Sequence, residues 1–108
     1  MTDNVAWAVE KIEQAGASLN LTKIQCGVEK ENLRINPDGS LSQTDHPRAL
    51  GSSLTHPFIT TDYSEALLEF VSPVCRSTTE LLQFLQRVHQ FVYQNIGQDN
   101  LWATSMPC

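Results

Sequence analysis

The hydrophobic positions of this chain follow helical spacing near its two ends and strand-like patterns in between. Near the amino terminus, apolar residues recur every three or four positions over residues 5–12, and Gly16 is a typical stop for the helix that this spacing predicts. A longer apolar stripe over residues 81–96 predicts a second helix. The sequence Ser-Thr-Thr-Glu at 77–80 has the form of a capping box, and Gly97 marks the expected end.

Between the predicted helices, the composition favours strands and tight turns. Residues 23–35 form a run, broken or bulged at Gly27, that predicts a strand. Asn-Pro-Asp-Gly at 36–39 is a strong turn signal, which would return the chain through residues 40–44 as a polar hairpin strand. Two further runs of β-branched, aromatic and aliphatic residues predict the strands Phe58–Tyr63 and Leu67–Val71.

These elements predict an α+β fold with a mainly antiparallel sheet and flanking helices. A length of 108 residues suits one domain with one core, which we place over residues 1–108. The apolar stripe of the second helix is wide enough to cover one face of the sheet. We therefore expect the opposite face to stay free for a ligand.

Two carboxylates stand two residues apart inside the first predicted strand. Side chains at alternate positions of a strand point the same way, so Glu29 and Glu31 share a face with Leu33. The nearest cations, Lys30 and Arg34, point to the opposite face and do not neutralise them. A divalent cation such as Mg²⁺, which prefers carboxylate oxygens, would balance this charge. The alternative is a solvent-facing strand with two ordinary glutamates.

A second pair of acids accompanies the later strands. Glu69 stands between Leu67 and Val71 on one strand face, where a soluble core normally places an aliphatic side chain. Asp62 lies near the end of the preceding predicted strand. Both acids support the metal hypothesis. Glu69 also fits the wet side of a half-exposed strand, and Asp62 also fits a turn residue that bonds its own backbone.

Composition restricts the partners and the location of the protein. Seven Lys and Arg against twelve Asp and Glu give a net charge of -5, which argues against nucleic acid and anionic membrane as partners. No apolar run approaches the roughly 18 residues of a membrane helix. The amino terminus lacks the basic start and apolar stretch of a signal peptide, so we expect a cytoplasmic location.

The cysteines and histidines show no pattern of a disulfide framework or a zinc site. Cys26, Cys75 and Cys108 are odd in number and have no Cys-x-x-Cys spacing. We expect Cys26, which alternates with apolar neighbours, to act as a small buried hydrophobe. None of the histidines has a spacing partner for zinc, and for His56 we expect a loop hydrogen bond.

Four ordered motifs carry a resemblance to a known family. They are Gly-Val-Glu-Lys-Glu-Asn-Leu-Arg-Ile (27–35), Gly-Ser-Ser-Leu-Thr-His-Pro-Phe-Ile-Thr-Thr-Asp-Tyr (51–63), Glu-Ala-Leu-Leu-Glu-Phe-Val-Ser-Pro (65–73) and Leu-Trp-Ala-Thr-Ser-Met-Pro-Cys (101–108). In this order they closely resemble the N-terminal part of the bacterial glutamate–cysteine ligases. The resemblance implies ATP-dependent joining of the γ-carboxylate of L-glutamate to the amine of L-cysteine through an acyl phosphate, the first step of glutathione biosynthesis. It also implies a fold that is part of a glutamine-synthetase-like catalytic domain.

The resemblance further implies roles for particular side chains. Glu29, Glu31, Asp62 and Glu69 match the acids with which the family holds Mg²⁺, or Mn²⁺, against the ATP phosphates and the glutamate carboxylate. Tyr63 is either a wall of the substrate pocket or a strand aromatic packed in the core. No residue of this chain is assigned a catalytic role.

The family's enzymes are several times longer than this chain, so the resemblance implies the remainder of the ligase catalytic domain as a partner. The sequence has no Gly-rich phosphate loop and no basic cluster for a triphosphate. We therefore expect the chain to supply part of the metal site and to be inactive alone. The alternative is a free-standing small α+β domain that binds a metal or an amino acid, or docks on a partner chain.

Overall fold

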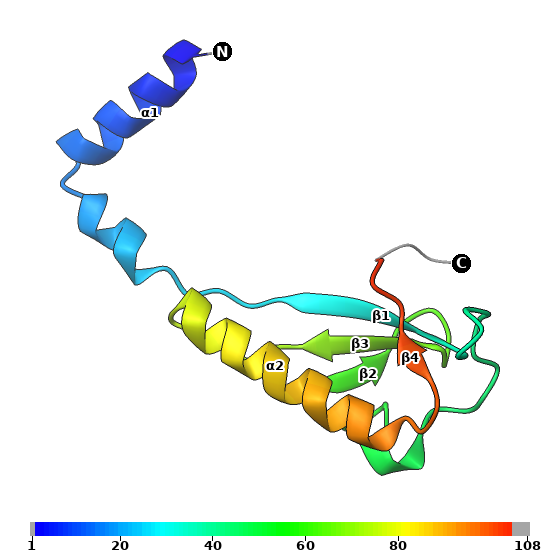
Figure 1. Cartoon of the computed structure of the whole chain (residues 1–108). Coiled ribbons are helices and arrows are strands. Elements are labelled where there is room, and N and C mark those ends of the chain that lie inside the picture. Colours follow the sequence, from blue (N-terminus) through cyan, green and yellow to red (C-terminus); the bar gives the residue numbers. More distant parts are fainter. Residues whose placement is uncertain (1, 105–108) are drawn as a thin grey trace.

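An antiparallel sheet forms the centre of the structure, a computed structural model that describes residues 2–104 (Figure 1). Within these residues the strands follow the order β2-β3-β1-β4. They are β1 (Glu29–Ile35), β2 (Ile59–Thr61), β3 (Leu67–Val71) and β4 (Asn100–Leu101). The helices are α1 (Thr2–Gln14) and α2 (Thr78–Asn95), with the short 3₁₀ helices η1 (Ser18–Lys23) and η2 (Arg48–Leu50). The predicted α+β fold, a mainly antiparallel sheet with flanking helices, is confirmed.

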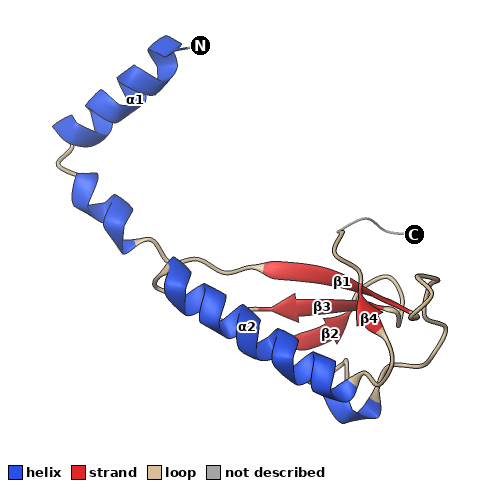
Figure 2. Ribbon diagram, in the orientation of Figure 1, coloured by secondary structure: helices blue, strands red, loops and turns tan. Residues whose placement is uncertain are grey.

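Helix α2 covers one face of the sheet (Figure 2). The strand residues Ile59, Leu68 and Phe70 pack against Val88 and Val92 of this helix in the main core. Phe70, Leu68 and Val92 are fully buried. The apolar stripe of α2 therefore finds its partner in the sheet, as its spacing predicted.

The start of α2 satisfies backbone groups that a first helical turn leaves unpaired. The Ser77 hydroxyl accepts a hydrogen bond from the Glu80 amide at 3.1 Å. The Glu80 carboxylate accepts one from the Arg76 amide at 2.7 Å. The predicted cap is confirmed, with the difference that Glu80 reaches one residue further back than in the usual reciprocal pair. Gly97, past the helix, has a φ of +65°.

Helix α1 extends away from the sheet (Figure 1). It confirms the first predicted helix, and Gly16 ends it with a φ of +63°. The apolar side chains of Val5 and Val9 are 66% and 49% exposed, so the sheet does not bury this helix's stripe. No helix within residues 2–104 is both long enough and apolar enough to cross a membrane.

Strand β1 is shorter than predicted, because it begins at Glu29 and not at residue 23. Of the predicted residues before it, Lys23 ends η1, whereas Cys26 makes an isolated antiparallel bridge to Cys75. The regular strand is therefore interrupted between Cys26 and Glu29, where the sequence predicted a break or bulge at Gly27.

The predicted hairpin strand over residues 40–44 is wrong. Leu41 makes one isolated bridge to Ile35, and residues 40–44 form no strand. The next position, Ser42, is buried and directs its hydroxyl to the Asp99 carboxylate at 2.8 Å. Strand β4, a two-residue strand that was not predicted, pairs with Arg34 and Ile35 on the side of β1 away from β3.

A buried arginine connects β1 to the segments around it. Arg34 is fully buried, and its Nη1 donates to Asp99 Oδ2 at 2.8 Å and to the Thr44 hydroxyl at 2.7 Å. Its Nη2 donates to the carbonyls of Thr44 (2.7 Å), Asp45 (3.2 Å) and Glu65 (3.1 Å). One side chain thereby fixes the loop after β1, the turn before β3 and the approach to β4.

Replacement of Asp99 by alanine tests how far the fold depends on this pair. Asp99→Ala leaves the Arg34 charge buried without its carboxylate partner, so we expect a loss of about 3–5 kcal/mol in the free energy of unfolding. Urea unfolding followed by circular dichroism measures it. Glu13→Ala, on exposed α1, is the control and is expected to stay within about 0.5 kcal/mol of the parent. An equal loss in both variants would contradict the assigned role.

Candidate metal site on the acidic sheet face

The strand register places three of the predicted acids on one face of the sheet. Glu31 lies directly opposite Glu69 in the pairing of β1 with β3. Glu29, two residues earlier on β1, points the same way and pairs in register with Val71. Opposed side chains in such a ladder have Cβ atoms roughly 4.5–5.5 Å apart, with diagonal neighbours at roughly 7–8 Å. The sheet itself therefore brings these carboxylates together.

Asp62 joins the same face from the end of β2. Thr60 lies opposite Glu69 in register, and Asp62, two positions later, points in the same direction. The Asp62 amide donates to the Leu67 carbonyl at 3.2 Å, which extends the pairing of β2 with β3. The Thr60 hydroxyl itself donates to the Ser53 carbonyl at 2.7 Å.

The acids of this face repel one another. Burial raises the pKa of the half-buried Glu69 carboxyl above its ordinary value, and the charges of Glu29, Asp62 and Glu31 raise that pKa further. A hydrogen bond with Glu29 acts in the same direction. Both effects disfavour the ionised form of Glu69, so the negative charge of this face is unfavourable in the absence of a bound cation.

The nearest cations are turned to the other face, as the alternation along β1 predicted. The Lys30 ammonium lies over the Phe70 ring, 5.9 Å from its centroid, and donates to the Asn32 side chain. Burial lowers the pKa of Lys30. Arg34 is engaged by Asp99. Neither cation compensates the carboxylates.

A hollow of about 310 Å³ lies at the acid face. Since every candidate ligand is a carboxylate, the donor set fits a hard divalent cation. The carboxylates share this face without converging on one point: within residues 2–104 no three Asp, Glu, His or Cys side chains lie close enough together to hold a metal ion. The hollow is lined by Val28, Glu29, Lys30, Glu31 and Glu69.

Tyr63 lies beside the acid face in an unusual backbone conformation. Its φ is +64°, a left-handed value that is uncommon for a bulky side chain. The turn is tight, because the Ser64 amide donates to the Asp62 carbonyl at 2.6 Å. The Tyr63 side chain is 88% exposed, so the alternative in which it packs in the core is wrong.

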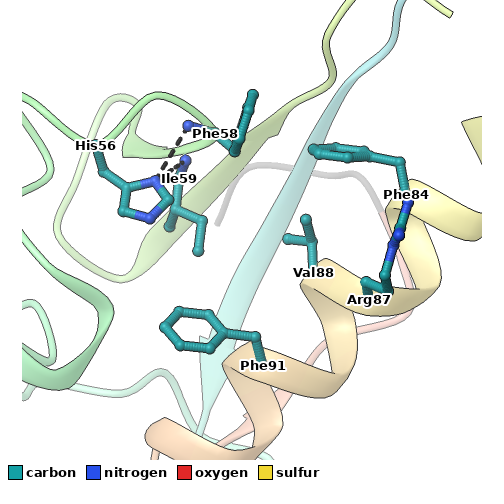
Figure 3. A pocket seen from close by; sticks show the side chains of 7 residues that line it. All are labelled: His56, Phe58, Ile59, Phe84, Arg87, Val88 and Phe91. Carbon is teal, nitrogen blue, oxygen red and sulfur yellow. Dashed lines mark hydrogen bonds between the residues drawn. The ribbon is translucent and has the colours of Figure 1, made fainter.

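A second hollow, of about 300 Å³, is apolar and lies on the helix-covered side (Figure 3). His56 Nδ1 accepts hydrogen bonds there from the amides of Phe58 at 3.1 Å and Ile59 at 3.0 Å, which confirms the predicted loop hydrogen bond. Phe84 and Phe91 of α2 form its opposite wall. No carboxylate lines this hollow, so it is separate from the acid face.

Comparison with known proteins identifies the family of the chain. The family model described as glutamate-cysteine ligase matches residues 9–108. Glutamate–cysteine ligases of Alcanivorax borkumensis and Hahella chejuensis are 53% and 51% identical over 93% and 99% of this chain. The matched parts are 19% and 20% of those relatives, so the chain spans about a fifth of their length.

Solved structures show the same arrangement of elements. The glutamate–cysteine ligase of Francisella tularensis in complex with AMP matches 75% of this chain and 16% of its own, with a TM-score of 0.72 and 35% identity. A bifunctional glutathione synthetase from Pasteurella multocida matches 89% of this chain and 13% of its own, with a TM-score of 0.81 and 29% identity. The expected glutamine-synthetase-like catalytic fold agrees with these neighbours. The chain belongs to the glutamate–cysteine ligase family, which is a family of ligase enzymes.

Proposed function

We propose that this chain supplies the metal-binding sheet of an enzyme that uses ATP to join the γ-carboxylate of L-glutamate to L-cysteine through an acyl phosphate. The observation that carries the proposal is the open sheet face that four carboxylates share without a neighbouring cation. Membership of the ligase family supports this chemistry. The AMP complex of the Francisella tularensis relative supports a nucleotide as co-substrate.

The metal of this proposal is Mg²⁺ or Mn²⁺. Glu31 and Glu69 would hold it from facing positions, with Glu29 beside them and Asp62 at the end of β2. When bound, the ion supplies positive charge that screens the ATP phosphates from the glutamate carboxylate. A bound metal ion, and not a neighbouring side chain, would balance the negative charge of the carboxylates. This explains why the metal-free face is electrostatically unfavourable.

Tyr63 is proposed as a wall of the substrate pocket. A strained backbone persists only where the surrounding structure enforces it, and such strain gathers at binding sites. Tyr63 adjoins Asp62 and is exposed on the same turn. The remaining parts of the nucleotide and cysteine sites are assigned to further residues of a ligase catalytic domain, so we expect residues 1–108 to be inactive alone. A cytoplasmic location is part of this proposal.

Substitution of single acids tests the metal site. In a chimaera that joins residues 1–108 to the rest of the Hahella chejuensis ligase, which is 51% identical over this region, Glu69→Gln or Glu29→Gln removes one charged ligand. A hydrogen bond or contact to a charged group is worth roughly 1.5–3 kcal/mol. We therefore expect the Mg²⁺ concentration for half-maximal rate to rise at least tenfold.

The matched control for this test is Glu13→Gln, which removes the same charge from exposed α1. It should leave the metal dependence of the rate unchanged. An unaltered Mg²⁺ requirement in both acid-face variants would refute the metal site. A chimaera that is inactive even with the parent acids, although folded, would favour the stand-alone binding module.

The pH dependence of stability tests the repulsion around Glu69 in the metal-free 108-residue chain. A raised pKa in the folded state means that ionisation of Glu69 costs stability, and this cost appears as the pH rises above the ordinary value of 4.5. Glu69→Gln removes it, so we expect a gain of about 0.5–1 kcal/mol at pH 7 that shrinks towards zero by pH 4. Urea unfolding at the two pH values measures the gain. An equal gain at both would show that charge is not its cause.

Two substitutions separate strain from binding at Tyr63. Tyr63→Gly relieves the left-handed backbone, and we expect it to stabilise the chain by about 0.5–1 kcal/mol, whereas Tyr63→Ala keeps the strain and does not. Both remove the ring, so both should raise the KM for L-glutamate in the chimaera several-fold. Steady-state kinetics and thermal unfolding measure the two effects. A KM unchanged in both variants would contradict a substrate contact.

A further inference from the structure

Cys26 and Cys75 face each other across an isolated antiparallel bridge beyond the end of the sheet. The Cys26 amide donates to the Cys75 carbonyl at 2.9 Å, and the Cys75 amide donates to the Cys26 carbonyl at 2.7 Å. Both thiols are free. Cys75 is fully buried, whereas Cys26 is only half-buried and is therefore the thiol that a small molecule reaches first.

The spacing of such a pair suits a covalent link. Residues that exchange both backbone hydrogen bonds have Cα atoms about 5.5 Å apart, which lies inside the roughly 4.4–6.8 Å that disulfides span. Their side chains leave the ladder on the same side. Burial raises the pKa of the Cys75 thiol, and the Glu80 carboxylate and the Cys26 thiol raise it further, in keeping with two neighbouring sulfur atoms.

The chain before Cys26 is free to make the small adjustment that closure needs. Opposed Cβ atoms lie roughly 4.5–5.5 Å apart, and a disulfide brings them to roughly 3.5–4.5 Å. Helix α1 extends away from the sheet and η1 has no buried residue, so neither holds this strand rigidly (Figure 1). An approach of about 1 Å by the Cys26 strand is enough.

We propose that Cys26 and Cys75 form a reversible modification site that a low-molecular-weight disulfide converts into a cross-strand disulfide. This goes beyond the expectation from sequence, in which Cys26 is only a small hydrophobe. The argument for this site does not rest on the proposed ligase activity, because the two cysteines are not among the acids of the proposed metal site.

The reaction is a two-step thiol–disulfide exchange. The Cys26 thiolate attacks one sulfur of the disulfide RSSR, the RSSR bond breaks and one thiolate leaves. The Cys75 thiolate then attacks Cys26 Sγ in the mixed disulfide, and the second thiolate leaves. The two protons of the cysteine thiols end on two molecules of RSH. Two cysteines are oxidised and one RSSR is reduced, so the exchange is balanced.

A Cys26–Cys75 disulfide would affect the neighbouring end of the sheet, because the β-bridge between the two cysteines continues the pairing of β1 with β3. Between this bridge and the pairing of Glu29 with Val71, the Ser72 amide donates to the Val28 carbonyl at 2.9 Å, and the Val28 amide donates to the Ser72 hydroxyl at 2.9 Å. A disulfide would hold the end of this ladder closed next to Glu29. It would also attach the α1 and η1 segment covalently to the chain that leads into α2.

The experiment uses the 108-residue chain with Cys108→Ala, in which Cys26 and Cys75 are the remaining cysteines. The folded variant is equilibrated with mixtures of reduced and oxidised glutathione, a linear low-molecular-weight disulfide, and the products are trapped with acid. We expect the intact mass to fall by two hydrogen atoms. After trypsin digestion, the fragments 24–30 and 49–76 should be found joined.

The equilibrium constant for oxidation of the two thiols shows whether the fold favours formation of the disulfide. A registered pair is held at a higher effective concentration than two cysteines in an open chain, so the constant should be at least tenfold larger in buffer than in concentrated urea. Cys26→Ser combined with Cys108→Ala is the matched control and should show no loss of mass. A ratio below tenfold, or thiols that stay reduced in the folded chain, would overturn the proposal. Circular dichroism of each variant establishes that it is folded.

Discussion

The fold depends on the complete burial of one positive charge. A guanidinium removed from water is unfavourable by several kcal/mol unless a carboxylate and further acceptors surround it. Arg34 meets this requirement only when Asp99, the loop at Thr44 and the carbonyl of Glu65 all converge on it. These segments are far apart in sequence. Their positions are therefore set by the need to pair the buried Arg34 guanidinium as much as by the apolar core beneath α2.

Successive side chains of β1 point to opposite faces of the sheet, so the strand places its cations on one face and its acids on the other. Lys30 and Arg34 lie towards the helix-covered face, where Phe70 and Asp99 receive them. Glu29 and Glu31 lie towards the open face, where the sheet adds Glu69 and no cation. The cations of the helix-covered face thus have partners of their own, whereas the carboxylates of the open face have no cation beside them. A chain that needed only stability would hardly keep glutamates directly opposed, since like charges in that position are unfavourable.

Local patterns predicted the elements that local interactions decide. The two helices, the turn after β1 and the bounds of β3 follow from side-chain spacing and capping residues, which act within a few positions. The face of each acid also followed, because alternation in a strand is a geometric rule. That Glu31 lies opposite Glu69 did not follow from spacing, since register is a long-range property. The same limit explains why β4 and the burial of Arg34 were missed, and why two alternatives stayed open for Tyr63.

The buried cation and the acid face are mechanically connected through the turn between β2 and β3. The strained backbone at Tyr63 requires support from its surroundings. That support comes from the end of the turn, where the Glu65 carbonyl accepts from the Arg34 guanidinium at 3.1 Å and the Ala66 carbonyl accepts from the Arg34 amide at 2.7 Å. Asp62 begins the same turn. Because its far end is fixed by Arg34, a residue of the helix-covered face determines how Asp62 and Tyr63 are presented on the opposite one.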